Sequence, residues 1–430
     1  AKATPTFNVI GAQSTTAAGQ IITYTATVTG ASGSLAPTGL RAWTLNGPTT
    51  ASKSCTTETV TTSGVSTIYT CVVPAVTVGT YTAAISVGFD NNYIAAGPST
   101  PLASLSVSQF APTVSVNTST SSTLLGTGFS FTATVSGPVG GVTPTGAGTW
   151  QIVGVSGIIC SNLNASTPTG TTNVVTYTCN VTASVAGTYV PVFTFNVNNA
   201  DTNYLATSPT SGYTTTVAKA TPVLSVTAAA PSAALGGVIT FNATVTGPTG
   251  ATTPSATGTW TITGVAGITS CTSTAGPSGI SNVASYSCTV NATTAGTYNA
   301  TFSFAGDSSY NAVGATSSSS ATLVATVAPT VAISTLSTPT LGGSLLFSAT
   351  VTGASGAAAP SGAMNFTISD PVSVTDICSS TTGASTTGVV TTYTCTVATP
   401  KVGSYIVSAN YVGDANYTSK SATATTVSLS

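Results

Sequence analysis

One pattern of residues occurs four times along this chain, and this repetition limits the possible folds more than any other feature. Each copy opens near a proline, and the four prolines follow one another at intervals of 107, 110 and 107 residues: Pro5, Pro112, Pro222 and Pro329. A fixed interval of this size indicates tandem modules. A module of about 108 residues is close to the commonest domain size and can enclose its own core. We therefore expect four domains, at 1–107, 108–217, 218–324 and 325–430.

The same landmarks return in the same order in every copy. An aromatic-x-Ala-Thr-Val-Thr/Ser-Gly segment comes first, at 24–30, 131–137, 241–247 and 347–353. A large aromatic, a cysteine pair, a Gly-Thr/Ser-Tyr and an Asp-x-x-Tyr follow it. Apolar and polar residues alternate, as half-buried strands require, and no stretch keeps a helical period. The sequence therefore predicts an all-β fold.

The large aromatic stands six residues after a second proline of each copy: Trp43, Trp150, Trp260 and Phe366. Such rings can pack in a core or present a platform on which sugars stack. Their fixed place on the expected third strand favours core packing.

Charged residues are rare, with six basic side chains, seven acidic ones and no histidine. No apolar run approaches the roughly 18 to 20 residues of a membrane-spanning helix, so we expect no membrane span. No basic patch could neutralise several phosphates, which argues against nucleic acid as a partner.

The scarcity of charge also bears on stability and association. Few titrating groups predict a stability that depends little on pH. Low charge also removes repulsion between molecules and favours association.

The eight cysteines fall two to a module: Cys55 and Cys71, Cys160 and Cys179, Cys271 and Cys288, and Cys378 and Cys395. They lack the spacing of zinc sites, and no histidine could complete such a site or activate a thiol. One disulfide within each module is the simplest interpretation, and it implies export to an oxidising, extracellular compartment. Antibody-type domains place the first cysteine before the core Trp. Here both follow the aromatic, so each bridge should join two neighbouring strands. The tyrosine of Gly-x-Tyr fits the position of a tyrosine corner.

Two segments of the last module carry a more specific likeness. Pro360-Ser-Gly-Ala-Met-Asn-Phe366-Thr and Tyr411-Val-Gly-Asp-Ala-Asn-Tyr417 resemble motifs of the group 3 bacterial immunoglobulin-like repeat. The likeness extends over all four copies, although modules 1 and 2 depart from the final motif, as in Gly88-Phe-Asp90-Asn-Asn-Tyr93. The resemblance implies seven-stranded sandwiches in a surface-exposed, array-forming protein without catalytic activity. Cysteine pairs are not a general mark of that family.

The repeated aspartates, Asp90, Asp201, Asp307 and Asp414, allow two interpretations. With neighbouring asparagines they could bind calcium, or they could close an Asx-turn in the last hairpin. One carboxylate falls short of the six to eight oxygens that calcium prefers, which favours the turn. We expect no metal and no cofactor.

Two further chemistries find little support. An intramolecular Lys–Asn cross-link would need a buried lysine in each module, and module 2 has no lysine. The chain has no histidine that could serve as a catalytic base, and its only close pair of carboxylates, Asp370 and Asp376, occurs in one module. We expect that the protein is not an enzyme.

Asn-x-Ser/Thr sequons are about as numerous as chance would supply in a chain so rich in Ser and Thr. They mark possible glycosylation at Asn117, Asn164, Asn180, Asn242, Asn291, Asn299, Asn365 and Asn416.

The two ends of the sequence look like the two halves of an internal junction. Ala1-Lys-Ala-Thr-Pro5 recurs at 218–222, and Thr-Thr-Val precedes that internal copy and also lies near the last residue. Chains could therefore stack head to tail, and a contact that does not close produces a filament. We expect an extracellular structural protein of the cell surface, a subunit of a filament, pilus-like fibre or layer built by head-to-tail and lateral contacts. Its partners would be copies of itself, and possible others are cell-surface components or glycans. The alternative is a spacer in an adhesin stalk, with carbohydrate binding less favoured.

Overall fold

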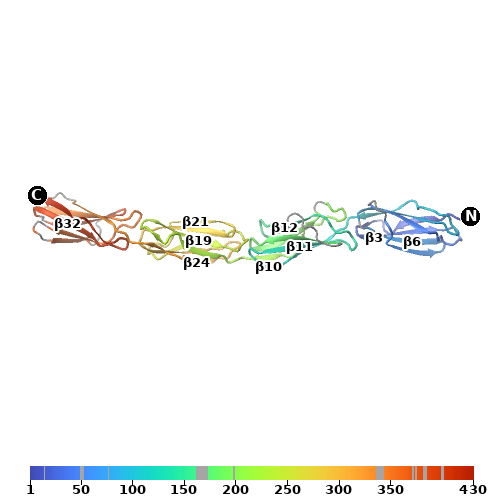
Figure 1. Ribbon diagram of the computed structural model, residues 1–430, viewed down its shortest axis with the longest axis horizontal. Helices are drawn as coiled ribbons and strands as arrows, with labels where there is room; N and C mark the ends of the chain where they lie inside the picture. The colour runs from blue at the N-terminus through green and yellow to red at the C-terminus, as the bar shows by residue number, and fades with distance from the viewer. Residues whose placement is uncertain are drawn as a thin grey trace. The chain divides into compact units, whose positions relative to one another are not determined.

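The computed structural model describes residues 1–430 except 14, 49–52, 76, 161–172, 197–198, 336–342, 370–371, 373–374, 381–384 and 399–400, and omits the side chains of 75 and 375–380. Every regular element of this described part is a β-strand (Figure 1). The chain divides into two compact units, Ala1–Ala218 and Lys219–Ser430. Each unit contains two of the repeated modules, and each module is a sandwich of two antiparallel-rich sheets.

In module 1 the sheets have the strand orders β1-β3-β6-β5 and β2-β8-β7-β4. The strands are β1 (Thr6–Gly11), β2 (Thr15–Ala17), β3 (Gln20–Thr29), β4 (Arg41–Asn46), β5 (Thr57–Ser63), β6 (Ser66–Ala75), β7 (Gly79–Val87) and β8 (Ala103–Ser108).

Module 2 repeats this arrangement with the orders β13-β11-β9 and β10-β16-β14-β12, and β15 adds to β14. The strands are β9 (Thr113–Thr118), β10 (Ser122–Leu124), β11 (Gly128–Ser136), β12 (Gly148–Val153), β13 (Val174–Thr182), β14 (Gly187–Phe195), β15 (Thr210–Ser211) and β16 (Thr215–Ala218).

Module 3 has the orders β17-β19-β22-β21 and β18-β25-β23-β20, with β24 on β23. The strands are β17 (Val223–Ala228), β18 (Ser232–Ala233), β19 (Val238–Thr246), β20 (Gly258–Thr263), β21 (Ser273–Ile280), β22 (Val283–Asn291), β23 (Gly296–Phe304), β24 (Val313–Ser317) and β25 (Thr322–Val324).

Module 4 has the orders β26-β27-β31-β30 and β29-β28-β32-β33, with β34 on β32. The strands are β26 (Thr330–Thr335), β27 (Ser344–Thr352), β28 (Met364–Ser369), β29 (Thr375–Ser380), β30 (Ser385–Thr387), β31 (Val390–Ala398), β32 (Gly403–Tyr411), β33 (Lys420–Ser421) and β34 (Thr425–Leu429). The predicted all-β class with four immunoglobulin-like sandwiches is thus confirmed.

The modules contain more than the seven strands that the family resemblance implied. In module 1 the first strand is divided: β1 pairs antiparallel with β3, and the chain then crosses so that β2 pairs in parallel with β8 of the other sheet. Modules 2 and 3 divide their first strand in the same way, through β10 with β16 and β18 with β25. The first strand therefore contributes to both sheets and closes one edge of the sandwich.

The alternating motif forms the core as its pattern predicts. In β3, Ile22, Tyr24, Ala26 and Val28 are buried, and the threonines between them face outward. Because successive side chains of a strand point to opposite faces, the apolar set packs against the facing sheet. There it meets Leu45, Tyr81 and Leu105.

The predicted core aromatics lie on β4, β12 and β20, the fourth strands of modules 1 to 3, and on the corresponding strand β28 of module 4. Phe366 is fully buried and Trp260 is 9% exposed, whereas Trp43 and Trp150 are half-buried. Trp150 packs at 4.8 Å from Phe193 and Trp260 at 4.7 Å from Phe302 between ring centroids. The buried Nε1 of Trp43 has no hydrogen-bond partner among the described residues.

The tyrosine of each Gly-x-Tyr is a tyrosine corner, as predicted. Tyr81, Tyr189, Tyr298 and Tyr405 each donate their hydroxyl to the carbonyl oxygen four residues earlier, at 3.1, 2.8, 2.7 and 2.9 Å. These hydrogen bonds satisfy the only polar atom of a ring that is otherwise buried, as burial of a hydroxyl requires.

Disulfides join Cys55 to Cys71, Cys160 to Cys179, and Cys271 to Cys288. Cys71 lies in β6, and Cys55 lies just before the neighbouring strand β5, so this bridge joins adjacent segments of one sheet. Cys288 in β22 and Cys271 just before β21 are related in the same way. Cys395 is also disulfide-bonded. The side chain of Cys378 lies outside the described residues.

Candidate functional site

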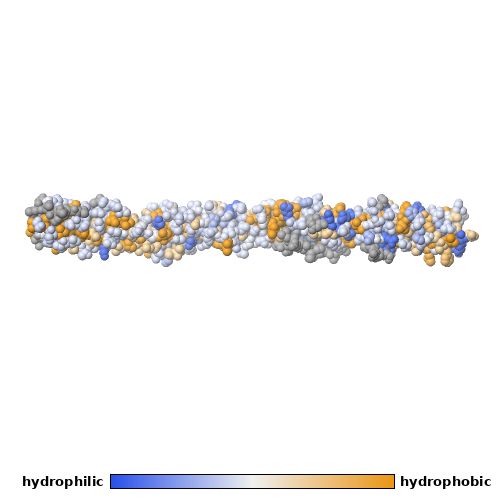
Figure 2. All heavy atoms as spheres, turned by 90° about the horizontal axis from the view of Figure 1, so that it is seen from above, coloured by the Kyte–Doolittle hydropathy of each residue, from blue (hydrophilic) through white to orange (hydrophobic). Residues whose placement is uncertain are grey.

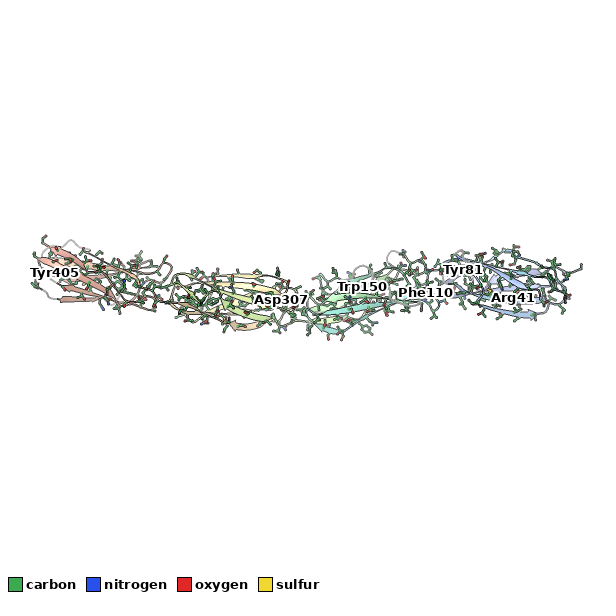
Figure 3. All side chains as sticks on the ribbon, in the orientation of Figure 1. Arg41, Tyr81, Phe110, Trp150, Asp307 and Tyr405 are labelled. Atoms are coloured by element: carbon green, nitrogen blue, oxygen red, sulfur yellow. A yellow bond between two sulfur atoms is a disulfide. The ribbon has the colours of Figure 1, made fainter. Side chains whose placement is uncertain are left out.

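The four repeated aspartates lie in the loops that follow β7, β14, β23 and β32, and their carboxylates accept backbone hydrogen bonds. In module 3, Asp307 accepts from the N–H groups of Ser309, Tyr310 and Ser255 at 2.8, 2.9 and 2.8 Å. Asp90 and Asp414 have the same three donors in their modules. The carboxylate thus closes an Asx-turn and ties this loop to the loop before the fourth strand (Asp307 is labelled in Figure 3).

These contacts lower the pKa of Asp90, Asp307 and Asp414. Partial burial alone would raise the pKa of Asp307, but the N–H donors of Ser255, Ser309 and Tyr310 outweigh burial and lower it. The pKa of Asp414 is lowered by equivalent donors and by the Tyr411 hydroxyl, against the effect of burial. Because N–H groups already occupy the carboxylate oxygens, a calcium ion would have to displace them. Among the described residues, no group of three or more His, Cys, Asp or Glu side chains could hold a metal ion.

The described residues also provide no constellation for catalysis or cross-linking. Lys2, Lys219, Lys401 and Lys420 are exposed, and Lys2 and Lys219 donate to the carbonyl oxygens of Asp90 and Asp307. Asp370 and the side chain of Asp376 lie outside the described residues. Four surface hollows, one of them lined by Thr244, Ser285 and Ser287, have no acidic or basic side chain in their walls.

The surface is nearly free of charge. Figure 2 shows strongly hydrophilic atoms at only a few places on the visible face, among mostly pale residues. One ion pair joins Arg41 and Glu58 at 2.7 Å. Among the described residues, no helix is long and apolar enough to span a membrane.

The possible glycosylation sites differ in accessibility. The exposed ones are Asn117, Asn180, Asn242, Asn291 and Asn365, whereas Asn299 is half-buried. Asn416 is only 8% exposed, so a glycan on its Nδ2 would have to displace the residues that cover this side chain in the folded protein. Asn164 lies outside the described residues.

The candidate site is the junction between consecutive modules within a unit. In the first unit, the side chain of Asn203 in module 2 accepts a hydrogen bond from the Val78 N–H of module 1 at 3.0 Å. A turn of module 1 at Gly19, with φ of +83°, lies against the turn of module 2 at 138–141, so close that a Cβ at Gly19 would lie 2.9 Å from the Gly141 Cα. Figure 3 labels Phe110 between Tyr81 of module 1 and Trp150 of module 2.

The second unit forms its junction from the same positions. Asn416 in module 4 accepts from the Ala295 N–H of module 3 at 2.8 Å, and the Ala358 N–H donates to Thr293 at 3.0 Å. The turn at Gly236, with φ of +85°, lies against the turn at 355–357. Both asparagines occupy the third position of Asp-x-Asn-Tyr, and both donor amides, those of Val78 and Ala295, directly precede the Gly-x-Tyr strand. The motif that closes one module therefore also binds the module before it.

The sequence singled out the Asp and Tyr of this motif but not the Asn between them. The third position reads Asn, Asn, Ser and Asn in the four copies, which weakens the repeat signal there. Nothing in the sequence indicated which loop of the preceding module it would meet.

Comparisons with known proteins give only distant likenesses. No protein-family model matches the chain, and no curated protein matches it. Similar solved structures include the Yersinia pseudotuberculosis adhesin InvE, with 15% identity over 50% of this chain and 60% of that one and a TM-score of 0.25. The Escherichia coli adhesin FdeC has 13% identity over 74% and 96% and a TM-score of 0.24. The bacterial integrin-binding protein invasin has 13% identity over 97% and 78% and a TM-score of 0.31. Similarities this low carry no information about what the chain binds.

Proposed function

We propose that the chain is an extracellular structural protein, a subunit of a surface filament, pilus-like fibre or layer that assembles through head-to-tail and lateral contacts of its immunoglobulin-like modules. The observation that carries this proposal is the repeated junction. Two module pairs form their junctions through an asparagine, a backbone amide and a pair of turns at equivalent positions. The two opposite ends of a module are therefore complementary. Such a contact between different ends is heterologous, and repetition of it builds an open polymer.

Three further observations support an exposed, structural role. Disulfides in three modules suit an oxidising compartment outside the cell. The nearly uncharged surface lacks the repulsion that keeps proteins apart in solution. The likeness to group 3 bacterial immunoglobulin-like repeats, which rests on the sequence motifs, agrees with a role on a bacterial surface.

A spacer in the stalk of a cell-surface adhesin is the second candidate, because stacked modules with repeated junctions also suit a stalk. Carbohydrate binding is less well supported, because Trp260 and Phe366 are buried and Trp43 and Trp150 pack in module cores. Electron microscopy of the purified chain distinguishes the candidates. Filaments many times longer than one chain support the structural subunit, and single four-module particles at every concentration refute it.

A further inference from the structure

We propose that Asn92 of module 1 and the Val402 N–H of module 4 are the two halves of a third junction, formed between two copies of the chain. This inference rests on the proposed head-to-tail assembly and specifies its contact. The Val402 N–H of one copy would donate to the Asn92 Oδ1 of the next. It would correspond to the bonds from Val78 to Asn203 and from Ala295 to Asn416.

Asn92 is held in the same backbone geometry as the two asparagines that form junctions. Its N–H donates to the Asp90 carboxylate at 2.7 Å, as those of Asn203 and Asn416 donate to Asp201 and Asp414 at 2.9 and 2.8 Å. Its carbonyl oxygen accepts from Ala3 at 3.0 Å, as theirs accept from Phe110 and Val327 at 2.9 and 3.1 Å. The loop therefore presents the Asn92 side chain from a preformed position.

What differs is the partner. Asn203 is half-buried and Asn416 is 8% exposed, whereas Asn92 is exposed and its side chain forms no hydrogen bond within the described part of the chain. Module 1 thus presents, without a partner among the described residues, the same kind of acceptor that is hydrogen-bonded in the other two junctions.

Val402 is the matching donor. It directly precedes the Gly-Ser-Tyr of β32, as Val78 and Ala295 precede the equivalent strands β7 and β23. Its N–H has no hydrogen-bond partner among the described residues, and the residue is 56% exposed, whereas Val78 and Ala295 are half-buried in their junctions.

The turn beside Asn92 repeats the turn that module 4 uses in its junction. Both have the sequence Thr-Gly-Ala-Ser-Gly, at 29–33 and 352–356, and their last glycines have φ of +80° and +79°. A Cβ at Gly356 would meet the Gly236 carbonyl oxygen of module 3 at 2.6 Å, whereas a Cβ at Gly33 would meet nothing within 4 Å.

Module 1 also exposes large apolar side chains around this end. Leu35, Leu40 and Phe89 are 74%, 86% and 75% exposed. The corresponding residues of module 4 are the small Ala358, Ala363 and Gly413. A contact between two copies lacks the covalent linker that holds modules 3 and 4 together, so it requires additional apolar burial to be stable. The larger side chains provide this area.

The test compares full-length Asn92→Leu with the neighbouring variant Asn91→Leu. Leucine matches asparagine in size but accepts no hydrogen bond, and it would leave the Val402 N–H buried without a partner. We expect association of Asn92→Leu, measured by sedimentation velocity over a concentration series, to be about tenfold weaker or more. Asn91→Leu should associate like the original chain, because Asn91 corresponds to the exposed Thr202 and Ala415.

A second measurement maps the contact directly. Full-length Asn92→Cys/Val402→Cys should form a ladder of disulfide-linked copies on a non-reducing gel, and neither single variant should form more than dimers. If the original chain polymerises but Asn92→Leu matches it and no ladder forms, the contact assigned here is wrong and the filament proposal survives. If the original chain remains monomeric at all concentrations, both are refuted.

Discussion

Tyr417→Phe should destabilise module 4 by removing one hydroxyl that two backbone groups share. The Tyr417 hydroxyl donates to the Ala358 carbonyl oxygen at 2.8 Å and accepts from the Ala354 N–H at 3.1 Å. The side chain is 1% exposed, so phenylalanine fits the same space without forming either bond. Each lost bond is worth about 1 kcal/mol, and an unpaired backbone group adds to this loss, so we expect about 1–3 kcal/mol in total.

Differential scanning calorimetry of the full-length chain measures this loss. For a module of this size, about 1 kcal/mol lowers the Tm by roughly 4–8 °C, so a loss of about 1–3 kcal/mol should lower the transition of module 4 by about 4–24 °C. Tyr213→Phe is the matched control, because Tyr213 is 71% exposed and its substitution should leave every transition in place. A Tyr417→Phe profile within 1 °C of the control, a margin well below the expected change of about 4–8 °C per kcal/mol, would show that the shared hydroxyl does not stabilise the loop.

Three other outcomes are expected. Gly247→Ala should lower the Tm of module 3 by an amount equivalent to about 1–3 kcal/mol, because the new Cβ would overlap the Tyr310 hydroxyl. In the same thermal scan Gly314→Ala should have little effect, because no atom lies within 4 Å of the Cβ position at Gly314. Urea unfolding should give a nearly constant stability between about pH 5 and 9 and a loss of stability above about pH 10. Burial raises the pKa of Tyr24 and Tyr177 to about 12, so their neutral hydroxyls stabilise the fold only until they ionise. An unfolding midpoint that moved strongly within the neutral range would contradict this. Thermal melts with and without a chelator should superimpose, and a drop in Tm on chelation would revive a calcium site at the aspartates.

The acidic side of the pH profile follows from the same reasoning with the opposite sign. The folded-state pKa values of Asp90, Asp307 and Asp414 are lowered, so their contribution is present above the unfolded pKa and disappears as the pH falls below it, under about pH 4. The sequence predicted weak pH dependence from the scarcity of charge alone. The structure adds that the buried tyrosines, which the count of charged residues ignores, set the alkaline limit.

Features that depend on local pattern could be predicted from the sequence. Alternation in Tyr24–Gly30 and its copies gave the strands, and the position of both cysteines after the aromatic gave bridges between neighbouring segments. The tyrosine corner followed from the Gly-x-Tyr motif. In each case the residues that determine the contact are close in sequence or repeat fourfold.

Features that depend on two distant surfaces could not be predicted. The bond from Val78 to Asn203 joins residues 125 positions apart, and only the packing of two modules brings them together. The division of the first strand into β1 and β2 was also missed, because each half is short and the break carries no Pro or Asn-Gly signal.

The divided first strand also determines how a module responds to a pulling force. Because β2 runs parallel to β8, the first and last strands point the same way, and tension applied to the two chain ends slides them past each other. Their hydrogen bonds are then loaded together rather than opened one at a time, which requires more force than unzipping. If a module did yield, the bridge between Cys55 and Cys71 would keep the residues between them from extending. We therefore expect a module pulled at its two ends to resist extension, first through the β2–β8 pairing and then through the disulfide.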